Sequence, residues 1–200
     1  MLCQFTVKNF KSIRDEVTFD MQAAAISEHE DRIIIDKDEE KYLPVSAVYG
    51  PNGGGKSNVL AALHTLVAKV LRPLLATEDS EEKVLLQRKI IVEPFAFSKS
   101  KDEPTEFELF FRTTVSEYRY ILHVKRDIVL YESLDRVKLE TGRKSALFTR
   151  DENGIVLKGA FAKLKVSDEL SKTLTLLSYL GIAYKGNAVV KDVLSWFEYG

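Results

Sequence analysis

The sequence predicts a mixed α/β fold, and three observations lead to that prediction. A short apolar segment at residues 45–49 precedes a glycine-rich stretch, and residues 57–75 then carry apolar side chains at helical spacing. The middle of the chain, about residues 90–149, is rich in β-branched and aromatic residues that alternate with polar ones. From about residue 167 the apolar spacing becomes helical again.

The N-terminal part is expected to form strands before the glycine-rich stretch. Residues 4–10 and 17–21 alternate between apolar and polar side chains, as strands with one buried face do. A charged segment at residues 27–41 follows, with a short apolar core at 33–35, and residues 45–49 are expected to be a strand. Pro73 is expected to end or bend the helix at 57–75 near its last turn.

The middle of the chain predicts an antiparallel meander with one solvated face. Strands are expected at residues 90–97, 105–113, 118–125, 128–139 and 146–149, and Asn153-Gly154 is a strong hairpin-turn signal. Helices are expected from about 167 to 180 and from 189 to 197. Because the sequence stops on the aromatic cluster 196–199, we expect further sequence or a partner to cover that cluster.

Composition excludes few functions. The 200 residues carry 29 basic and 30 acidic side chains, so the net charge of -1 gives no argument for nucleic-acid binding. Cys3 is the only cysteine, which excludes an internal disulfide and favours a reducing compartment. The sequence suggests no membrane span and no signal peptide, and we expect a cytoplasmic protein.

The glycine-rich stretch matches a phosphate-binding loop. Residues 50–57 read G-P-N-G-G-G-K-S and fit the pattern G-x-x-x-x-G-K-[ST]. Glycines let backbone N–H groups face a polyanion, the following helix adds its free N–H groups and positive dipole end, and Lys56 adds an ammonium. The hydroxyl of Ser57 can bind Mg²⁺ together with phosphate oxygens. Chance matches occur in about one chain in a hundred of this length, so the loop predicts triphosphate binding.

Residues around this loop resemble a known family. The stretches FTVKNFKSI at 5–13, VTF at 17–19 and AVYGPNGGGKSN at 47–58 resemble the N-terminal part of ABC-type ATPases of the SMC/RecF superfamily. The similarity is closest to the prokaryotic phage-defence and abortive-infection branch, and the stretches EPTEFELFF, YRY and VLYESL resemble the β-lobe of that branch. The resemblance implies the N-terminal lobe of an ABC-ATPase head, a P-loop NTPase fold with an antiparallel β-subdomain and the start of a helical insertion.

The resemblance also implies site residues. The positions that match the family's nucleotide-binding loop are Asn52, Gly53, Gly54, Gly55, Lys56, Ser57 and Asn58. Lys11 and Ser12 lie where relatives contact nucleotide phosphate or ribose, although they are equally well explained as ordinary residues at a strand exit. Gln87 is the available match for a glutamine that senses Mg²⁺, and the implied cofactors are ATP and Mg²⁺.

The sequence lacks two further parts of such an ATPase. It contains neither an apolar strand ending in Asp-Glu nor a convincing S-G signature motif, so no catalytic residue is assigned in this chain. In the family these parts follow a helical or coiled-coil insertion. The chain therefore looks like the N-terminal portion of a longer ATPase, with ATPase core strands, loop and helix at 1–76, a β-rich lobe at 77–165 and the start of the insertion at 166–200.

The resemblance implies two ATPase heads that face each other as a homodimer or higher oligomer. Hydrolysis would regulate a nuclease or toxin effector in anti-phage defence, or act in DNA maintenance. DNA is a possible partner, and no membrane partner is expected. The isolated chain is expected to hydrolyse ATP hardly at all. A non-catalytic nucleotide sensor or scaffold is the alternative, and a small P-loop kinase is a weaker one because the strand-rich middle does not suit a compact kinase.

Other polar residues give weaker signals. His29, His64 and His123 have no ligand spacing that predicts a metal site. The acidic run at residues 36–40 is expected to be a solvated loop rather than a cation site.

Overall fold

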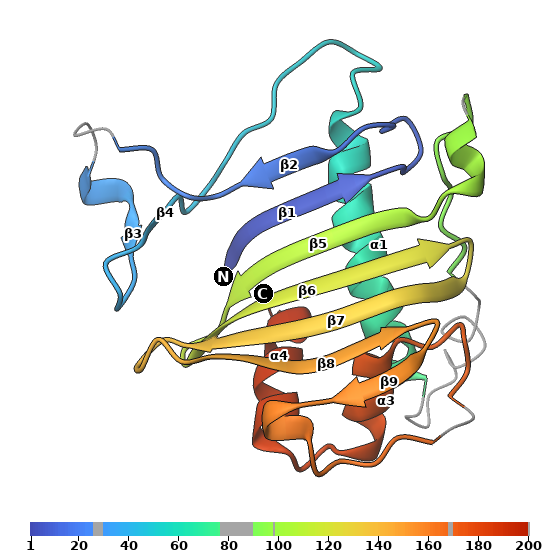
Figure 1. Ribbon diagram of the computed structural model, residues 1–200. Coiled ribbons are helices and arrows are strands. Elements are labelled where there is room, and N and C mark those ends of the chain that lie inside the picture. The colour runs from blue at the N-terminus through green and yellow to red at the C-terminus, as the bar shows by residue number, and fades with distance from the viewer. Residues whose placement is uncertain (26–29, 77–89, 98, 168–169, 200) are drawn as a thin grey trace.

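The protein has one large antiparallel sheet whose helices pack on a single face (Figure 1). The computed structural model describes residues 1–25, 30–76, 90–97, 99–167 and 170–199. The strands are β1 (Leu2–Lys8), β2 (Val17–Asp20), β3 (Ile34–Ile35), β4 (Lys41–Tyr42), β5 (Thr105–Arg112), β6 (Ser116–Lys125), β7 (Ile128–Lys138), β8 (Lys144–Asp151) and β9 (Gly154–Leu157). The helices are α1 (Lys56–Leu75), α3 (Leu176–Ala183) and α4 (Ala188–Tyr199), with short 3-10 helices η1 (Glu30–Arg32), η2 (Lys99–Asp102) and η3 (Gly159–Phe161).

The main sheet contains seven strands in the order β2-β1-β5-β6-β7-β8-β9. Every neighbouring pair is antiparallel, and β5 through β9 follow one another as a meander, which confirms that prediction. Asp151 pairs with Gly154 at the β8–β9 hairpin, where the turn was expected. Strands β1 and β2 of this sheet come from the range 1–76, and the meander comes from the range 77–165. The division of the chain into those ranges stays a prediction.

Alternation along the strands separates a buried face from a more open one. In β5 the side chains of Phe107, Leu109 and Phe111 are buried, while the intervening Glu106 and Glu108 are half-buried. The same pattern continues in β6, whose buried side chains are Ser116, Tyr118, Tyr120, Leu122 and Val124. The apolar face packs against the helices in one continuous core, as a sheet with one solvated face does.

The three helices meet at a glycine. A Cβ atom at Gly181 of α3 would lie 2.6 Å from Leu74 Cδ2 of α1 and 2.7 Å from Leu194 Cδ1 of α4. An added Cβ atom would force these leucine side chains to shift, because real Cβ atoms essentially never come so near to other heavy atoms. Gly181 therefore lets α3 pack closely against both neighbours.

The first helix follows the sequence prediction closely. It contains Pro73 in its last turn and ends at Leu75, two residues later. By length and composition α1 would also qualify as a membrane span, which the sequence analysis did not expect. Its buried apolar residues Ala62, Leu66 and Val70 belong to the core of the domain.

The C-terminal aromatic cluster is mostly buried, which corrects the expectation that it needs a cover. Trp196 and Phe197 are 6% and 5% exposed, and both rings contact Phe111 of β5, with centroid separations of 4.8 and 5.6 Å. Tyr199 alone of the cluster's aromatic residues is exposed. The amphipathic spacing of α4 places two of the three rings on its sheet-facing side.

The start of α3 is held by a buried carboxylate. Glu132 of β7 is completely buried and accepts hydrogen bonds from Leu176 N at 2.6 Å, Leu177 N at 2.9 Å and the Tyr120 hydroxyl at 2.9 Å. Burial raises the pKa of Glu132, and these donors partly offset that effect. The helix begins only at Leu176, so the predicted start near residue 167 was too early.

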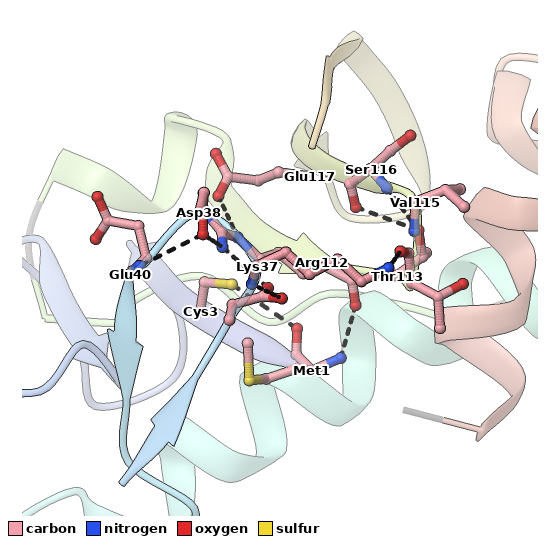
Figure 2. Close-up of polar contacts among 12 residues, drawn as sticks. Met1, Cys3, Lys37, Asp38, Glu40, Arg112, Thr113, Val115, Ser116 and Glu117 are labelled. Carbon is pink, nitrogen blue, oxygen red and sulfur yellow. Dashed lines mark hydrogen bonds and ion pairs between the residues drawn. The ribbon is translucent and has the colours of Figure 1, made fainter. Parts of the chain in front are cut away.

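The acidic run at residues 36–40 is a largely exposed turn, as expected, but two of its carboxylates also pair with the sheet. Arg112 at the end of β5 is buried, and its guanidinium contacts Asp38 at 2.7 and 2.8 Å, Asp36 at 3.0 Å and Glu117 at 2.7 Å. Figure 2 shows Asp38 and Glu117 converging on Arg112 from different segments. The hydrogen bond from Arg112 lowers the pKa of Asp38. These ion pairs fix the β3–β4 hairpin against the sheet.

Two predicted strands are absent from the described residues. At 90–97 the one ladder contact is an isolated bridge between Val92 and Arg126, so the chain there is a connection and not a strand. Residues 45–49 form no strand either, and Val45 and Tyr49 are 77% and 91% exposed. Strand structure requires a hydrogen-bonding neighbour, and the described residues place none beside this segment.

Candidate nucleotide-binding site

The glycine-rich loop lies at the N-terminus of α1, where its sequence predicted it. Gly53 and Gly55 have φ values of 79° and 83°, in the left-handed region that side chains with a Cβ rarely adopt. The loop is closed by a hydrogen bond from Gly54 N to the carbonyl of Pro51 at 3.1 Å. The loop therefore uses two of its glycines for a backbone shape that other residues would adopt only with strain.

The start of α1 keeps donors available for an anion. Gly55 is the residue before the helix, no side chain caps the first turn, and that turn contains no acidic residue. Asn58 N donates to the Gly55 carbonyl at 2.9 Å, and the N–H groups at this helix end, like the positive end of the helix dipole, meet no competing carboxylate from the first turn. Such a helix end favours phosphate.

Lys56 folds back over the loop that precedes it. Its Nζ donates to the carbonyl oxygens of Gly50 and Pro51, both at 2.7 Å. These neutral acceptors hold the ammonium across the mouth of the loop, where it can exchange them for phosphate oxygens. Exchange of these carbonyls for phosphate oxygens would add the attraction between opposite charges to bonds that the ammonium already makes.

The turn after β1 comes against the loop. Asn58 Nδ2 donates to Ser12 Oγ at 2.6 Å, and a Cβ at Gly55 would lie 3.3 Å from the same oxygen. Ser12, Gly55 and Asn58 are thus brought together by segments that are 43 or more residues apart in the sequence. Lys11 lies beside Ser12, with a φ of 49° and its Nζ 5.5 Å from the centroid of the Phe10 ring.

The remaining candidate residues are distributed differently. Asn52 and Ser57 are exposed, Asn52 in the loop and Ser57 as the second residue of α1, so both are accessible to a ligand. Gln87 lies outside the described residues. Within the part of the chain that the structure describes, no group of three or more His, Cys, Asp or Glu side chains could hold a metal ion.

One element of the site was missed by the sequence analysis. Asn9, at the base of the turn that carries Ser12, is 1% exposed and has a φ of 55°. Its neighbours Lys11 and Ser12 drew attention through the family resemblance, whereas a buried asparagine after a strand has no distinctive sequence signal. The possible hint is residue type, since asparagine tolerates the left-handed region better than most residues.

The arrangement can grip a polyphosphate through backbone N–H groups, the ammonium of Lys56 and the polar side chains at its rim. Loop residues 50–58 and the turn residues Lys11 and Ser12 include no carboxylate that could polarise a water. These residues supply hydrogen-bond donors and positive charge.

Comparison with known families agrees with this geometry. The family described as "AAA domain, putative AbiEii toxin, Type IV TA system" matches residues 45–187, from the exposed segment before the loop to the residue before α4. No curated protein matches the sequence significantly. Since the family match covers well over half of the 200 residues and includes the whole phosphate-binding loop, the chain belongs to this AAA-domain family of P-loop ATPases.

Proposed function

We propose that the protein binds Mg·ATP at the loop and is the phosphate-binding part of an ABC-type ATPase. The observation that carries this proposal is the combination of left-handed Gly53 and Gly55 with Lys56 held across the loop by carbonyl groups. The phosphates would replace those carbonyls, and Mg²⁺ would be held between phosphate oxygens and the hydroxyl of Ser57. The backbone N–H groups and Lys56 would orient the triphosphate and balance its charge.

Hydrolysis in this proposal depends on residues outside the described site. The exposed apolar segment at 45–49 supports this view, because its unpaired backbone could accept a neighbouring strand. A strand ending in Asp-Glu, together with an S-G signature from a second head, would complete the site in a head-to-head dimer. The chain by itself would bind nucleotide and hydrolyse it hardly at all.

The biological role we propose is regulation of a nuclease or toxin effector in anti-phage defence, in the cytoplasm. The family description supports the direction, since it names a toxin of a type IV toxin–antitoxin system. The resemblance of residues 5–13 and 47–58 to the SMC/RecF superfamily supports the same role, because that resemblance implies a link to DNA. A role in DNA maintenance, with DNA as a partner, would share this mechanism.

A non-catalytic nucleotide sensor is the second candidate, and the missing Asp-Glu strand favours it. Two steps distinguish the ATPase from the sensor. The coding sequence is first read beyond codon 200, and the protein with any such extension is then assayed for Mg²⁺-dependent phosphate release. Release that disappears in a Lys56→Ala variant supports the ATPase. Saturable Mg·ATP binding by the extended protein without any release would support the sensor instead.

A further inference from the structure

The turn between β1 and β2 holds Ser12 at its tip. Phe10 N donates to the carbonyl of Ile13 at 2.8 Å, and Ile13 N donates to the carbonyl of Phe10 at 2.7 Å. Phe10 and Ile13 are buried, while Lys11 and Ser12 between them are exposed. The tip is therefore short and anchored on both sides, and its direction depends on the residue that precedes it.

That residue, Asn9, is tied to two other segments. Its Oδ1 accepts from Phe95 N at 2.9 Å, and its Nδ2 donates to the carbonyls of Glu103 at 3.0 Å and Pro104 at 3.1 Å. Its own carbonyl accepts from the Thr105 hydroxyl at 2.6 Å. The side chain thus joins the end of β1 to two separate points of the connection that enters β5.

We propose that Asn9 is a positioning residue for the phosphate-binding loop, an inference that rests on the proposed function. It acts through Ser12, whose Oγ must lie against Gly55 and accept from Asn58 at 2.6 Å. A hydrogen bond is lost beyond about 3.5 Å, so a shift of the turn by roughly 1 Å removes this brace. Asn58 and Gly55 flank Lys56, and the brace therefore sets the orientation of the helix start that receives the phosphates.

A second contact ties the turn to the same connection. Lys11 N donates to the carbonyl of Glu93 at 2.9 Å, two residues before the Phe95 amide that binds Asn9. The turn is thus fixed at its base by Asn9 and at its tip by Lys11. The amide of Phe95 and the carbonyls of Glu103 and Pro104 are main-chain atoms, so their positions do not depend on side-chain rotamers.

The test combines three variants of the full chain with calorimetric titration of Mg·ATP. Asn9→Gly keeps a backbone that tolerates a positive φ and removes the side-chain bonds. We expect Asn9→Gly and Ser12→Ala each to weaken binding roughly five- to tenfold, the loss expected for one braced hydrogen bond. We expect the double variant to bind no more weakly than the weaker single variant, because both changes remove the same brace.

Asn187→Gly is the matched control for a purely structural effect. Asn187 Oδ1 accepts from Val189 N at 2.9 Å and Val190 N at 3.1 Å at the start of α4, so the same substitution removes side-chain hydrogen bonds to main-chain atoms outside the loop. Its affinity for Mg·ATP should equal that of the unaltered chain. If Asn9→Gly does not fold, Thr105→Val loosens the same anchor by removing the 2.6 Å bond to the Asn9 carbonyl, and a two- to threefold loss is expected.

The outcomes distinguish failure of the positioning role of Asn9 from failure of nucleotide binding. If the unaltered chain binds Mg·ATP but Asn9→Gly binds equally well, or if the losses multiply in the double variant, Asn9 has no positioning role. If Asn9→Gly does not fold and Thr105→Val is tested in its place, an affinity equal to that of the unaltered chain also shows that Asn9 has no positioning role. If the unaltered chain gives no saturable heat at all, the proposed function fails, and the inference fails with it.

Discussion

Replacing glycines of the loop with alanine tests its backbone geometry. Gly53 and Gly55 have nearly the same φ, but a Cβ at Gly53 meets nothing within 4 Å, whereas one at Gly55 lies 3.3 Å from Ser12 Oγ. Gly186 has neither a positive φ nor any atom within 4 Å of its Cβ position. Gly53→Ala therefore tests backbone strain alone, Gly55→Ala tests backbone strain together with a side-chain contact, and Gly186→Ala is a control for both.

The magnitudes follow from these differences. A left-handed backbone costs a residue with a Cβ about 1–2 kcal/mol, so Gly53→Ala should lower the free energy of unfolding by about that amount. Gly55→Ala should lower it by about 2–3 kcal/mol, because displacing Ser12 adds the loss of a hydrogen bond worth about 1 kcal/mol. Gly186→Ala should be neutral or stabilising by about 0.4–1 kcal/mol.

The assay is urea unfolding followed by tryptophan fluorescence, since Trp196 is the only tryptophan and is buried against the sheet. Adding Ser12→Ala should cost nothing further in the Gly55→Ala background, where the bond to Asn58 is already lost, and about 1 kcal/mol in the Gly53→Ala background, where that bond is intact. The reasoning is refuted if Gly55→Ala is as stable as Gly186→Ala, or if Ser12→Ala destabilises both glycine variants equally.

Three further predictions concern two anchors of the fold, Glu132 and Asp38, and the turn residue Lys11 beside the site. Glu132→Gln should lower the free energy of unfolding by about 1–3 kcal/mol, because its amide nitrogen faces a backbone N–H that the carboxylate now satisfies; an unchanged urea midpoint would contradict this. The pKa of Asp38 is lowered in the folded state by Arg112, so its contribution is present above the ordinary value of about 3.9 and is lost as pH falls through the lowered value. Asp38→Asn should therefore reduce the loss of stability between pH 4 and more acidic conditions, measured by thermal melts, and an identical acid profile would count against the ion pair. Lys11→Gly should leave the fold at least as stable, since φ is 49° there, and circular dichroism melts combined with Mg·ATP titration show whether the ammonium also contacts nucleotide.

Much of the fold could be predicted because its signals are local. The alternation at Glu106-Phe107-Glu108-Leu109 defines one strand face, the Asn153-Gly154 turn defines one hairpin, and apolar spacing defines α1. These patterns depend on periods of two and 3.6 residues within a single segment. They specify an element without knowledge of its neighbours.

The errors arise where the outcome depends on a distant partner. Residues 45–49 have the composition of a strand, but a strand also needs a paired neighbour, and the described residues provide none. The acidic run at 36–40 is exposed, as its composition predicts, but the sequence did not reveal its ion pairs with the buried Arg112, more than 70 residues away. Neither partner can be read from the segment itself.

The candidate site was predicted to a similar degree. The motif located the loop and Lys56 because glycine and lysine at fixed spacing reflect a physical requirement of phosphate binding. The sequence could not place Ser12 against Asn58, nor identify Asn9 as the anchor of that turn, because both depend on the path of the chain between β1 and α1.

The central claim is that the loop and Lys56 form a receptor for a triphosphate. Isothermal titration calorimetry of the unaltered chain with Mg·ATP, beside a Lys56→Ala variant of matched stability, tests it most directly. We predict saturable binding by the unaltered chain and a loss of at least tenfold in the variant, the effect of removing one charged hydrogen-bond donor. Absence of saturable heat, or equal affinity of the two proteins, would contradict the claim.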